Sequence, residues 1–351
     1  MVTPQKSQTL RDRTFMRLKQ SIAGQESDGH AVFFYYTYPF YQSVTHVDLN
    51  AYFHDPKVTF DVQLEVLELL ERCGSFAPDE GAVAECSALG ASVIFDEHGF
   101  ISVKPAELEE LDDVLAIKPG DPYGDNYMRR ALESLEYMLQ HAPADLKVNP
   151  PVMHGPFTVA AQLRGISDMC MDILVEEDKA KALLEVCTET CIRFLKAAEK
   201  MMGGQLHHIL VADDISSFLS PDQYREWVVP YYRMIFKEFP GVQRWLHNDA
   251  SAEHLLDQIE EAGWDAWQYA PAIDSLKALE RTQGKVSLMG GLNPVELQSL
   301  TEEETYNHCM EKLQYFGGKT KLVLAPGGSV NQVPIDNLKA NLRAADTYKI
   351  G

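Results

Sequence analysis

The sequence predicts an α/β fold, a (β/α)8 TIM barrel with a helical N-terminal extension. Three observations predict it: apolar, β-rich runs alternate with helical stretches, eight such runs fit into 351 residues, and helix-start signals follow most of them. Repeated strand–helix alternation is typical of a parallel sheet covered by helices. About eight strands over this length favour a closed barrel over an open sheet.

The strands are expected in a regular series along the chain. They begin at Ala31, Ala91, Leu146, Leu206, Val242, Asp265, Lys285 and Thr320. The first 150 residues are less regular, with helices expected near residues 57–73 and 127–141. We expect the helical extension to cover part of the barrel mouth. No linker or internal repeat is evident, so we expect a single domain over residues 1–351, with residues 1–75 forming the partly helical extension and first strand.

Helix starts are marked by capping residues. Ser220, Pro221 and Gln223 form an N-cap, a first-turn proline and a capping-box partner. Residues 293–296 repeat this pattern, and residues 301–304 give another. Each start lies at or shortly after a predicted strand end, and in a barrel this is the face where catalytic groups sit.

Charge and cysteine usage narrow the class of protein. The chain has 31 Lys and Arg against 52 Asp and Glu, a net charge of −21. Such a surface repels nucleic acid and anionic membranes, and it disfavours a highly anionic substrate. No apolar run is long enough for a membrane span, and the N-terminus lacks a signal-peptide apolar region. With six cysteines, we expect reduced, mostly buried thiols in a cytoplasmic protein.

Polar groups gather at the predicted strand ends, which a barrel brings to one rim. From this set we expect four catalytic residues: Asp213, Asp214, His247 and Asp249. We expect five substrate-binding residues from the same ends: Asp79, Phe157, Asn248, Gln268 and Asn293.

His247 and Asp249 are candidate metal ligands. Alternate residues of a strand share a face, so the two side chains can converge on one atom. Imidazole with carboxylate suits zinc, and a catalytic zinc keeps one position open. The alternative is that His247 is a hydrogen-bonded polar residue and Asp249 only caps the following helix.

Asp213 and Asp214 close a strand of apolar residues. Paired carboxylates in a partly buried site can separate their pKa values and so provide acid and base functions. The alternative is a helix cap next to a solvated residue. We interpret His207 and His208, at the start of this strand, as core histidines rather than as ligands.

An aromatic segment, residues 33–41, follows the first strand. Alternate rings, among them Tyr36 and Tyr38, are expected to line a pocket for a flat or apolar substrate. Packing of these rings into a core beneath the helical extension is the alternative.

Several motifs together resemble the uroporphyrinogen decarboxylase superfamily, whose fold is a (β/α)8 barrel. They occur in the order Gly155-Pro156-Phe157-Thr158, Asp213-Asp214, Phe218-Leu219-Ser220-Pro221, Pro230, His247-Asn248-Asp249, Gly290-Gly291-Leu292-Asn293-Pro294 and Ala325-Pro326-Gly327-Gly328. The resemblance runs from about Asp79 to the C-terminus. It implies one of two activities: decarboxylation of uroporphyrinogen, or methyl transfer to or from the cobalt of a corrinoid protein.

Two departures favour the methyltransferase branch. The decarboxylases carry an arginine-rich segment after the first strand, whereas this chain has no Arg there and Lys57 as its only Lys. Unpaired substrate carboxylates would be costly in such a site. Residues 85–90, Glu-Cys-Ser-Ala-Leu-Gly, are also similar to the methyltransferases.

The ligand positions implied by the resemblance are altered. Thiol-methylating relatives bind zinc through a His-x-Cys pair and a later cysteine in a Pro-Gly-Cys turn. Here these positions hold Asp249 and Gly328. The resemblance with two thiolates lost implies a harder metal site, or none.

The leading hypothesis is therefore a corrinoid-dependent methyltransferase that demethylates a small donor such as a methoxylated aromatic. A partner protein would carry the corrinoid, whose cobalt(I) attacks the methyl carbon. A zinc ion on His247 and Asp249, or a protonated Asp213 or Asp214, would stabilise the leaving oxygen. Two alternatives stay open: a lyase acting on a smaller carboxylated substrate, and a non-catalytic binding or scaffold protein.

Overall fold

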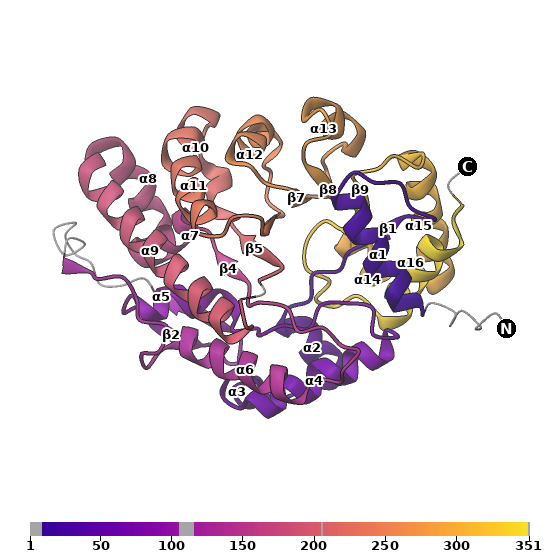
Figure 1. Cartoon of the computed structure of the whole chain (residues 1–351), viewed down its shortest axis with the longest axis horizontal. Coiled ribbons are helices and arrows are strands. Elements are labelled where there is room, and N and C mark those ends of the chain that lie inside the picture. Colours follow the sequence, from indigo (N-terminus) through magenta and orange to yellow (C-terminus); the bar gives the residue numbers. More distant parts are fainter. Residues whose placement is uncertain (1–8, 105–115, 205, 350–351) are drawn as a thin grey trace.

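A curved parallel sheet forms the centre of the molecule in the computed structural model, which describes residues 9–104, 116–204 and 206–349. Seven strands pair in the order β1-β9-β8-β7-β6-β5-β4 and are covered by helices, which gives seven of the eight strands of a TIM barrel (Figure 1). The strands are β1 (Ala31–Val32), β4 (Met153–His154), β5 (His208–Ala212), β6 (Gln243–Asn248), β7 (Ala266–Tyr269), β8 (Ser287–Leu292) and β9 (Leu322–Pro326). All seven were predicted from the sequence.

The predicted strand at Ala91 is wrong as a barrel strand. Residues of this segment form β2 (Ser92–Phe95), which pairs antiparallel with β3 (Ile101–Lys104) in a separate hairpin. Most of β2 is exposed, whereas every residue of β5 is buried. The Asp96 carboxylate accepts hydrogen bonds from the backbone of His98 and Phe100 and closes the turn. An apolar run alone does not distinguish such a hairpin from a buried parallel strand.

An extended segment, residues 74–79, lies between β1 and β4 instead. The Phe76 carbonyl accepts a hydrogen bond from the backbone N–H of Asn149, just before β4, at 2.7 Å. The Cys73 carbonyl accepts one from the Tyr36 hydroxyl, just beyond β1, at 3.2 Å. These contacts link the segment to the chain on both sides of the gap in the sheet.

The helices after β4 cover the outside of the barrel. They are α7 (Pro156–Arg164), α8 (Ile166–Val175), α9 (Glu177–Met201), α10 (Pro221–Trp227), α11 (Val229–Glu238), α12 (Leu256–Ala262), α13 (Ser275–Arg281), α14 (Pro294–Ser299), α15 (Glu302–Phe316) and α16 (Ile335–Thr347), with short 3-10 turns at Ile215–Phe218 and Glu253–Leu255. The predicted caps are present: Ser220 and Thr301 each complete a capping box, and Asn293 accepts from the Val295 N–H.

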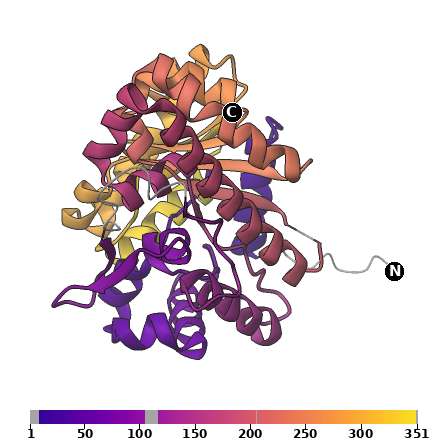
Figure 2. The same ribbon diagram turned by 90° about the vertical axis from the view of Figure 1, so that its left-hand side faces the viewer.

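The N-terminal helices gather on one side of the barrel. They are α2 (Tyr38–Thr45), α3 (Leu49–His54), α4 (Pro56–Leu69), α5 (Ala84–Ala88) and α6 (Tyr127–His141), with a 3-10 turn at Gly81–Val83. Figure 2 shows these purple helices together, apart from the orange and yellow helices of the C-terminal half. The helices predicted near residues 57–73 and 127–141 correspond to α4 and α6.

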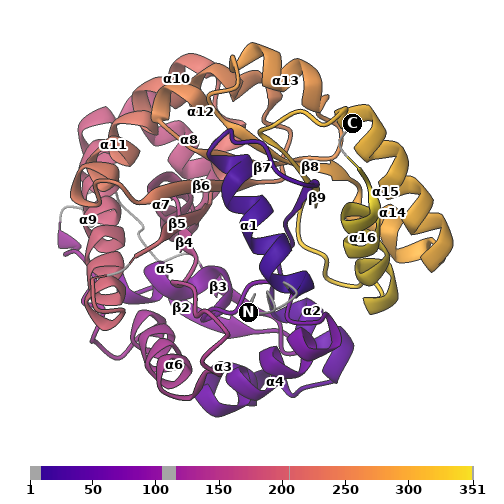
Figure 3. The same cartoon turned by 45° about the vertical axis from the view of Figure 1, so that its right-hand side comes forward.

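The first helix, α1 (Leu10–Ile22), lies across the amino-terminal ends of the strands (Figure 3). Ser21 donates to the carbonyl of Leu322 at the start of β9, and Ser287 at the start of β8 donates to the Ile22 carbonyl. The prediction that the extension covers the barrel mouth is therefore wrong for α1, which closes the opposite end. Residues of α2, α4, α5 and α6 line the cavity at the carboxyl end.

The inside and the outside of the sheet belong to separate apolar clusters. The interior cluster is small and includes Phe33, Leu210, Trp245, Met289 and Val323, whereas the larger one fills the space between strands and helices. All six cysteines are free and five are buried, in agreement with the expectation of buried thiols. Among the described residues, no helix combines the length and apolar character needed to cross a bilayer.

Candidate active site and metal centre

The carboxyl end of β6 presents His247 in a defined orientation. Its Nδ1 donates to the Oε1 atom of Gln268, its neighbour on β7, at 2.8 Å. The Gln268 amide nitrogen donates in turn to the carbonyls of Pro326 and Gly328, at 2.8 and 3.1 Å. Because the two carbonyls require the amide N–H groups, the amide oxygen must face His247. The lone pair of His247 Nε2 is therefore left free for a ligand.

Two carboxylates converge on the free side of His247. Asp249 Oδ2 lies 3.9 Å from His247 Nε2, and Asp214 Oδ1 accepts a hydrogen bond from the Asp249 backbone N–H at 2.9 Å. Ligand atoms of the three side chains all lie within 4.8 Å of one another, and Asp214 and Asp249 are partly open to solvent. One nitrogen and two oxygen ligands with an accessible position fit a catalytic zinc site. The structure therefore adds Asp214 to the two ligands that the sequence predicted.

Burial raises the pKa of Asp249, and the neighbouring Asp214 raises it further against the opposing effect of His247. Two carboxylates held together without a cation repel each other, and a divalent cation would remove this repulsion. The donor set thus fits a metal ion on electrostatic grounds as well as by geometry.

Gly328 stands where the resemblance implies a third metal ligand, and the Asp249 carboxylate lies in the space beside it. A Cβ atom at residue 328 would lie 2.6 Å from Asp249 Oδ2, closer than atoms pack in proteins. The backbone φ of Gly328 is +139°, which also favours glycine. A side chain at 328 would therefore displace the Asp249 carboxylate from its present position.

Asp213 has a different environment from Asp214. Its side chain is fully buried and accepts hydrogen bonds from Thr158 at 2.7 Å and from Tyr232 at 2.6 Å. A Cβ on Gly155 would collide with both Asp213 and Tyr232, so the glycine leaves room for this contact. Burial raises the pKa of Asp213 although these hydroxyls lower it. Asp213 supports the strand ends, while Asp214 reaches the open site.

Asn248 and Asn293 also serve local structure. The Asn248 amide donates to the Asp213 carbonyl at 2.8 Å and its oxygen accepts from the Ala250 N–H, so a buried side chain holds the β6 turn. Asn293 caps α14, with its oxygen 3.0 Å from the Val295 nitrogen. Neither lines the cavity next to His247.

That cavity has a volume of about 260 Å³ and extends from the metal-ligand candidates toward β1 and β4. The described residues that line it include Asp79, Glu80 and Asp214 but no Lys or Arg. Its volume is just below the roughly 300–1,000 Å³ typical of sites for drug-sized ligands. The cavity therefore suits a small ligand with few negative charges.

The aromatic segment contributes through a ring that the sequence did not select. The ring of Tyr35 packs 4.3 Å from that of His247, and Tyr35 forms a parallel bridge with Ser329. Tyr36 stacks on Phe40 in the outer cluster. It still borders the cavity, as does Tyr38. Phe157 is buried in the core and does not line it.

Asp79 and Glu80 form an acidic wall. Burial raises the pKa of Asp79 to about 6, although hydrogen bonds from the backbone N–H of Gly81 and from the Tyr52 hydroxyl lower it. Burial and the charge of Asp79 raise the pKa of Glu80 well above its usual range. Its Oε2 atom has no hydrogen-bond partner among the described residues. Such carboxyl groups can hold and release a proton near neutral pH.

The sequence reasoning missed an ion pair between His154 and Glu85. The imidazole Nδ1 lies 3.1 Å from one Glu85 oxygen, and the His154 backbone N–H donates to the other at 2.9 Å. Burial lowers the pKa of His154, but the Glu85 carboxylate outweighs this effect and raises it. His154 ends β4, the same position that drew attention to His247 on β6, and this signal could have identified it.

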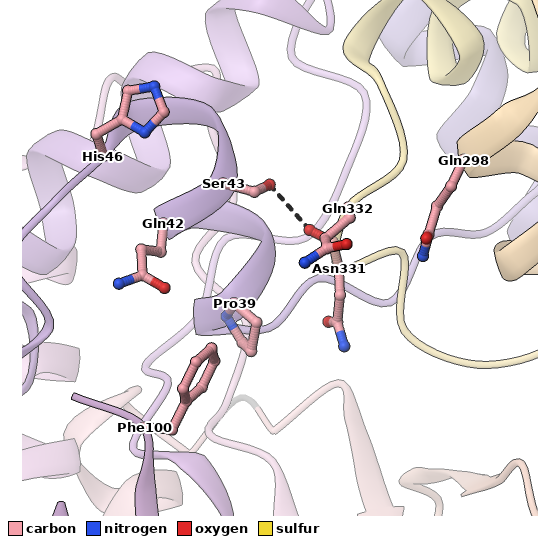
Figure 4. A pocket seen from close by; sticks show the side chains of 8 residues that line it. All are labelled: Pro39, Gln42, Ser43, His46, Phe100, Gln298, Asn331 and Gln332. Carbon is pink, nitrogen blue, oxygen red and sulfur yellow. Dashed lines mark hydrogen bonds between the residues drawn. The ribbon is translucent and has the colours of Figure 1, made fainter. Parts of the chain in front are cut away.

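A larger groove lies beside the mouth of the barrel, next to the cavity at Pro39. It has a volume of about 700 Å³ and is lined by Pro39, Gln42, Ser43, His46, Phe100, Gln298, Asn331 and Gln332. Ser43 on α2 donates to the Asn331 carbonyl at 2.9 Å and joins the two sides of the rim (Figure 4). With His46 as the only titratable lining residue described, the groove has polar amides but little means of catalysis.

Residues 16–348 match the family model described as uroporphyrinogen decarboxylase (URO-D). The methylated-thiol–coenzyme M methyltransferase of Methanosarcina mazei is 28% identical over 198 residues, covering 55% of this chain and 52% of that protein. The uroporphyrinogen decarboxylase of Christiangramia forsetii is 25% identical over 170 residues, covering 48% and 49%. The chain thus spans about half the length of the curated relatives it matches.

Among solved structures, a methyltransferase from Methanosarcina mazei superposes with a TM-score of 0.80 at 21% identity. The superposition covers 96% of this chain and 98% of the other. At this identity the similarity establishes the fold, and it agrees with the predicted barrel.

Proposed function

The chain belongs to the uroporphyrinogen decarboxylase (URO-D) family, and on that premise we propose that it is a corrinoid-dependent methyltransferase. It would move a methyl group from a small donor to the cobalt of a corrinoid carried by a partner protein. The observation that carries this proposal is the cluster of Asp214, His247 and Asp249 at the edge of a small cavity without lysine or arginine.

The donor we propose is an oxygen-linked methyl compound, such as a methoxylated aromatic. Carboxylate and imidazole ligands give a harder metal site than thiolates do, which suits an oxygen atom better than sulfur. The aromatic walls and the volume of about 260 Å³ suit a compound with one ring. The similar protein from Methanosarcina mazei is named for a methylated thiol, so the proposed donor differs in the atom that holds the methyl group.

The side chains divide the work of positioning. Gln268 keeps Nε2 of His247 free, and Tyr35 packs against the imidazole ring. A zinc ion held by Asp214, His247 and Asp249 would supply Lewis-acid stabilisation for the oxygen that keeps the electron pair when the methyl–oxygen bond breaks.

Proton transfer would fall to the acidic wall. Asp79, with its pKa raised to about 6 by burial, is able to give a proton to the departing oxygen and to recover it from solvent. The Glu85 carboxylate, 3.1 Å from His154, raises the pKa of this imidazole and so favours its positive form beside the carboxylates of the cavity.

The partner would approach at the barrel mouth. The corrinoid, when bound to that partner, would supply the nucleophile and the acceptor for the methyl group. The groove lined by Gln42, Gln298, Asn331 and Gln332 adjoins the cavity and carries no Asp or Glu among its described lining residues. In a chain of net charge −21, such an uncharged border lets another protein approach without strong repulsion.

The lyase alternative has less support. A carboxylated substrate needs cationic partners, and the described lining residues include no Lys or Arg and only the two histidines, His154 and His247. Two uroporphyrinogen decarboxylases are among the relatives, at 25% and 27% identity. Release of carbon dioxide in the absence of any corrinoid protein is the result that would favour this activity.

The test is methyl transfer to a purified corrinoid protein, followed by absorbance of the corrinoid, with a panel of O-, N- and S-methyl donors. We expect transfer from an aryl methyl ether and bound zinc close to one per chain. Asp214→Asn should lose both, and Asp222→Asn, on the exposed face of α10, should lose neither. Transfer from thiol donors alone would overturn the proposed donor. Absence of transfer from every donor would overturn the activity and favour the scaffold alternative.

A further inference from the structure

A second cavity lies at the opposite, amino-terminal end of the barrel. Its volume is about 340 Å³, and it is enclosed by α1, by Lys147 before β4, and by the starts of β5 and β6. Figure 3 shows α1 crossing this end of the molecule. Nothing in the proposed methyl transfer uses this cavity.

The lining of this cavity is positively charged, whereas the chain as a whole is negatively charged. It contains Arg11, Lys19, Arg72, Lys147, His207 and His208, and no Asp or Glu among the described residues. The chain as a whole has 52 acidic residues against 31 basic ones. A local set of this kind holds a positive potential where the average surface is negative.

Two of these cations have no counter-ion. Arg11 and Arg72 pair with Asp145, at 3.8 and 2.7 Å. In the part of the chain that the structure describes, Lys19 and Lys147 form no ion pair with a carboxylate.

The two lysines lie on one aromatic ring. Their Nζ atoms are 5.6 and 5.4 Å from the centroid of the Phe15 ring. Burial lowers the pKa of Lys147, and the charge of Lys19 lowers it further. Lys19 and Lys147 both line this cavity, so both add to the positive potential that a bound anion would experience.

The floor of the cavity is flat and aromatic. The rings of His208 and Trp245 stack with centroids 4.3 Å apart and an interplanar angle of 11°. Burial, and next the charge of Lys147, lower the pKa of His208 to about 3, so its ring is neutral. The Trp245 indole N–H is buried without a hydrogen-bond partner among the described residues. The floor thus combines stacking surface with an unused donor, a costly arrangement in an empty site.

We propose that the amino-end cavity binds a small aromatic anion, a carboxylate or sulfonate on one or two rings. The anionic group would lie between Lys19 and Lys147, and the rings would pack against His208 and Trp245. The two ammonium groups supply charge-assisted hydrogen bonds, and the apolar walls supply burial. His207 and His208, which the sequence suggested as core histidines, line this binding site.

The probe for the test is 1-anilinonaphthalene-8-sulfonate, titrated into the full-length protein and followed by its fluorescence and by calorimetry. We expect one saturable site per chain that weakens at high ionic strength, because the contact with the lysines is electrostatic. The uncharged analogue N-phenyl-1-naphthylamine should bind at least about tenfold more weakly, since it lacks the sulfonate.

Lys147→Gln should weaken binding of the sulfonate about tenfold, and the double variant Lys19→Gln/Lys147→Gln should abolish the saturable site. Neither should lower the melting temperature of the free protein, because both remove repulsion. Lys312→Gln is the matched control, because Lys312 also lies beside an aromatic ring, 5.4 Å from that of Tyr315, but outside the cavity. This variant should bind the sulfonate as the wild type does. Equal affinity of the double variant and the wild type, or equal affinity for the neutral analogue, would overturn the proposal.

Discussion

The two ends of the barrel carry opposite charge on the same framework. At the carboxyl end, Asp214 and Asp249 converge on His247. At the amino end, Lys19 and Lys147 each lie near the Phe15 ring, and no carboxylate is among the described lining residues. The net charge of −21 describes neither end. The contrast shows that the ligand of a cavity follows from its own lining, and that composition excludes a class of ligand only on average.

The two ends also differ in how firmly their side chains are held. At the carboxyl end, His247 is held by the hydrogen bond that it donates to Gln268, and Asp213 by those that it accepts from Thr158 and Tyr232. At the amino end, Lys19 and Lys147 contact the Phe15 ring and form no ion pair with a carboxylate of the described residues. We infer that the carboxyl end is organised before its ligand binds, whereas the amino end gains order from its ligand.

The largest effect on the carboxyl end is expected when the His247 side chain is removed. We expect His247→Ala to lose the bound metal and to lower kcat/KM for methyl transfer about 10³-fold, since one of three ligands is lost. Metal analysis and corrinoid absorbance measure the two effects. His98→Ala, in the exposed turn of the β2–β3 hairpin, is the control. Full activity without His247 would remove the carboxyl end from the mechanism.

The next largest effect distinguishes the role of Asp213 from that of Asp214. Asp213→Ala leaves the buried hydroxyls of Thr158 and Tyr232 without an acceptor, so we expect a loss of about 2–4 kcal/mol in the free energy of unfolding. Denaturant unfolding measures it, and Asp222→Ala, which is exposed, should change little. Normal stability combined with lost activity would instead make Asp213 a catalytic group.

A smaller effect is expected from the support behind the metal. Gln268→Leu removes the acceptor for His247 Nδ1, which should weaken zinc binding about 10- to 100-fold because the imidazole orientation is no longer fixed. Competition with a chelator measures this affinity. Anion binding at the amino end should stay unchanged in the same variant, and a parallel loss there would mean that the two ends are not independent.

Asp79 of the acidic wall should make the free energy of unfolding depend on pH. Because burial raises the pKa of Asp79 to about 6, the folded protein holds a proton that the unfolded chain has lost, and stability falls as pH rises from about 4 to 6. Asp79→Asn should remove this fall, worth about 1–2 kcal/mol for a side chain partly open to solvent. Melting temperatures of both proteins across this range measure it. Parallel curves would show that Asp79 is not perturbed.

The smallest effect concerns the helix that closes the amino end. Asp346 on α16 binds Arg13 and Arg17 of α1, at 2.9 and 3.3 Å. Asp346→Ala should cost about 1 kcal/mol, since the contact is partly exposed. It should weaken the binding of the aromatic sulfonate while leaving methyl transfer intact. Lost methyl transfer at wild-type stability would contradict the separation of the two ends.

The sequence predicted the parts of this molecule that local chemistry decides. Seven barrel strands and the caps at Ser220 and Thr301 follow from patterns within a few residues. The strand at Ala91 was placed wrongly, because its apolar run is the same in a hairpin and in a barrel. The extended segment beside β4 was not predicted as a barrel element, because contacts distant in sequence position it.

The candidate site was predictable in its residue types but not in its geometry. Strand ends indicated His247, Asp214 and Asp249, but only the structure separates Asp214 from Asp213. Alternation in the aromatic segment selected Tyr36, whereas Tyr35 contacts His247. The contact of His154 with Glu85 joins residues 69 positions apart, which periodicity does not reveal.

Gly328 also couples two positions of this site. A Cβ atom at 328 would lie 2.6 Å from Asp249 Oδ2, and the φ of +139° strains any L side chain there. A cysteine at 328 would therefore turn the Asp249 carboxylate away from its present position and strain the backbone of the turn. The effects of substitutions at 249 and 328 are for this reason not expected to add.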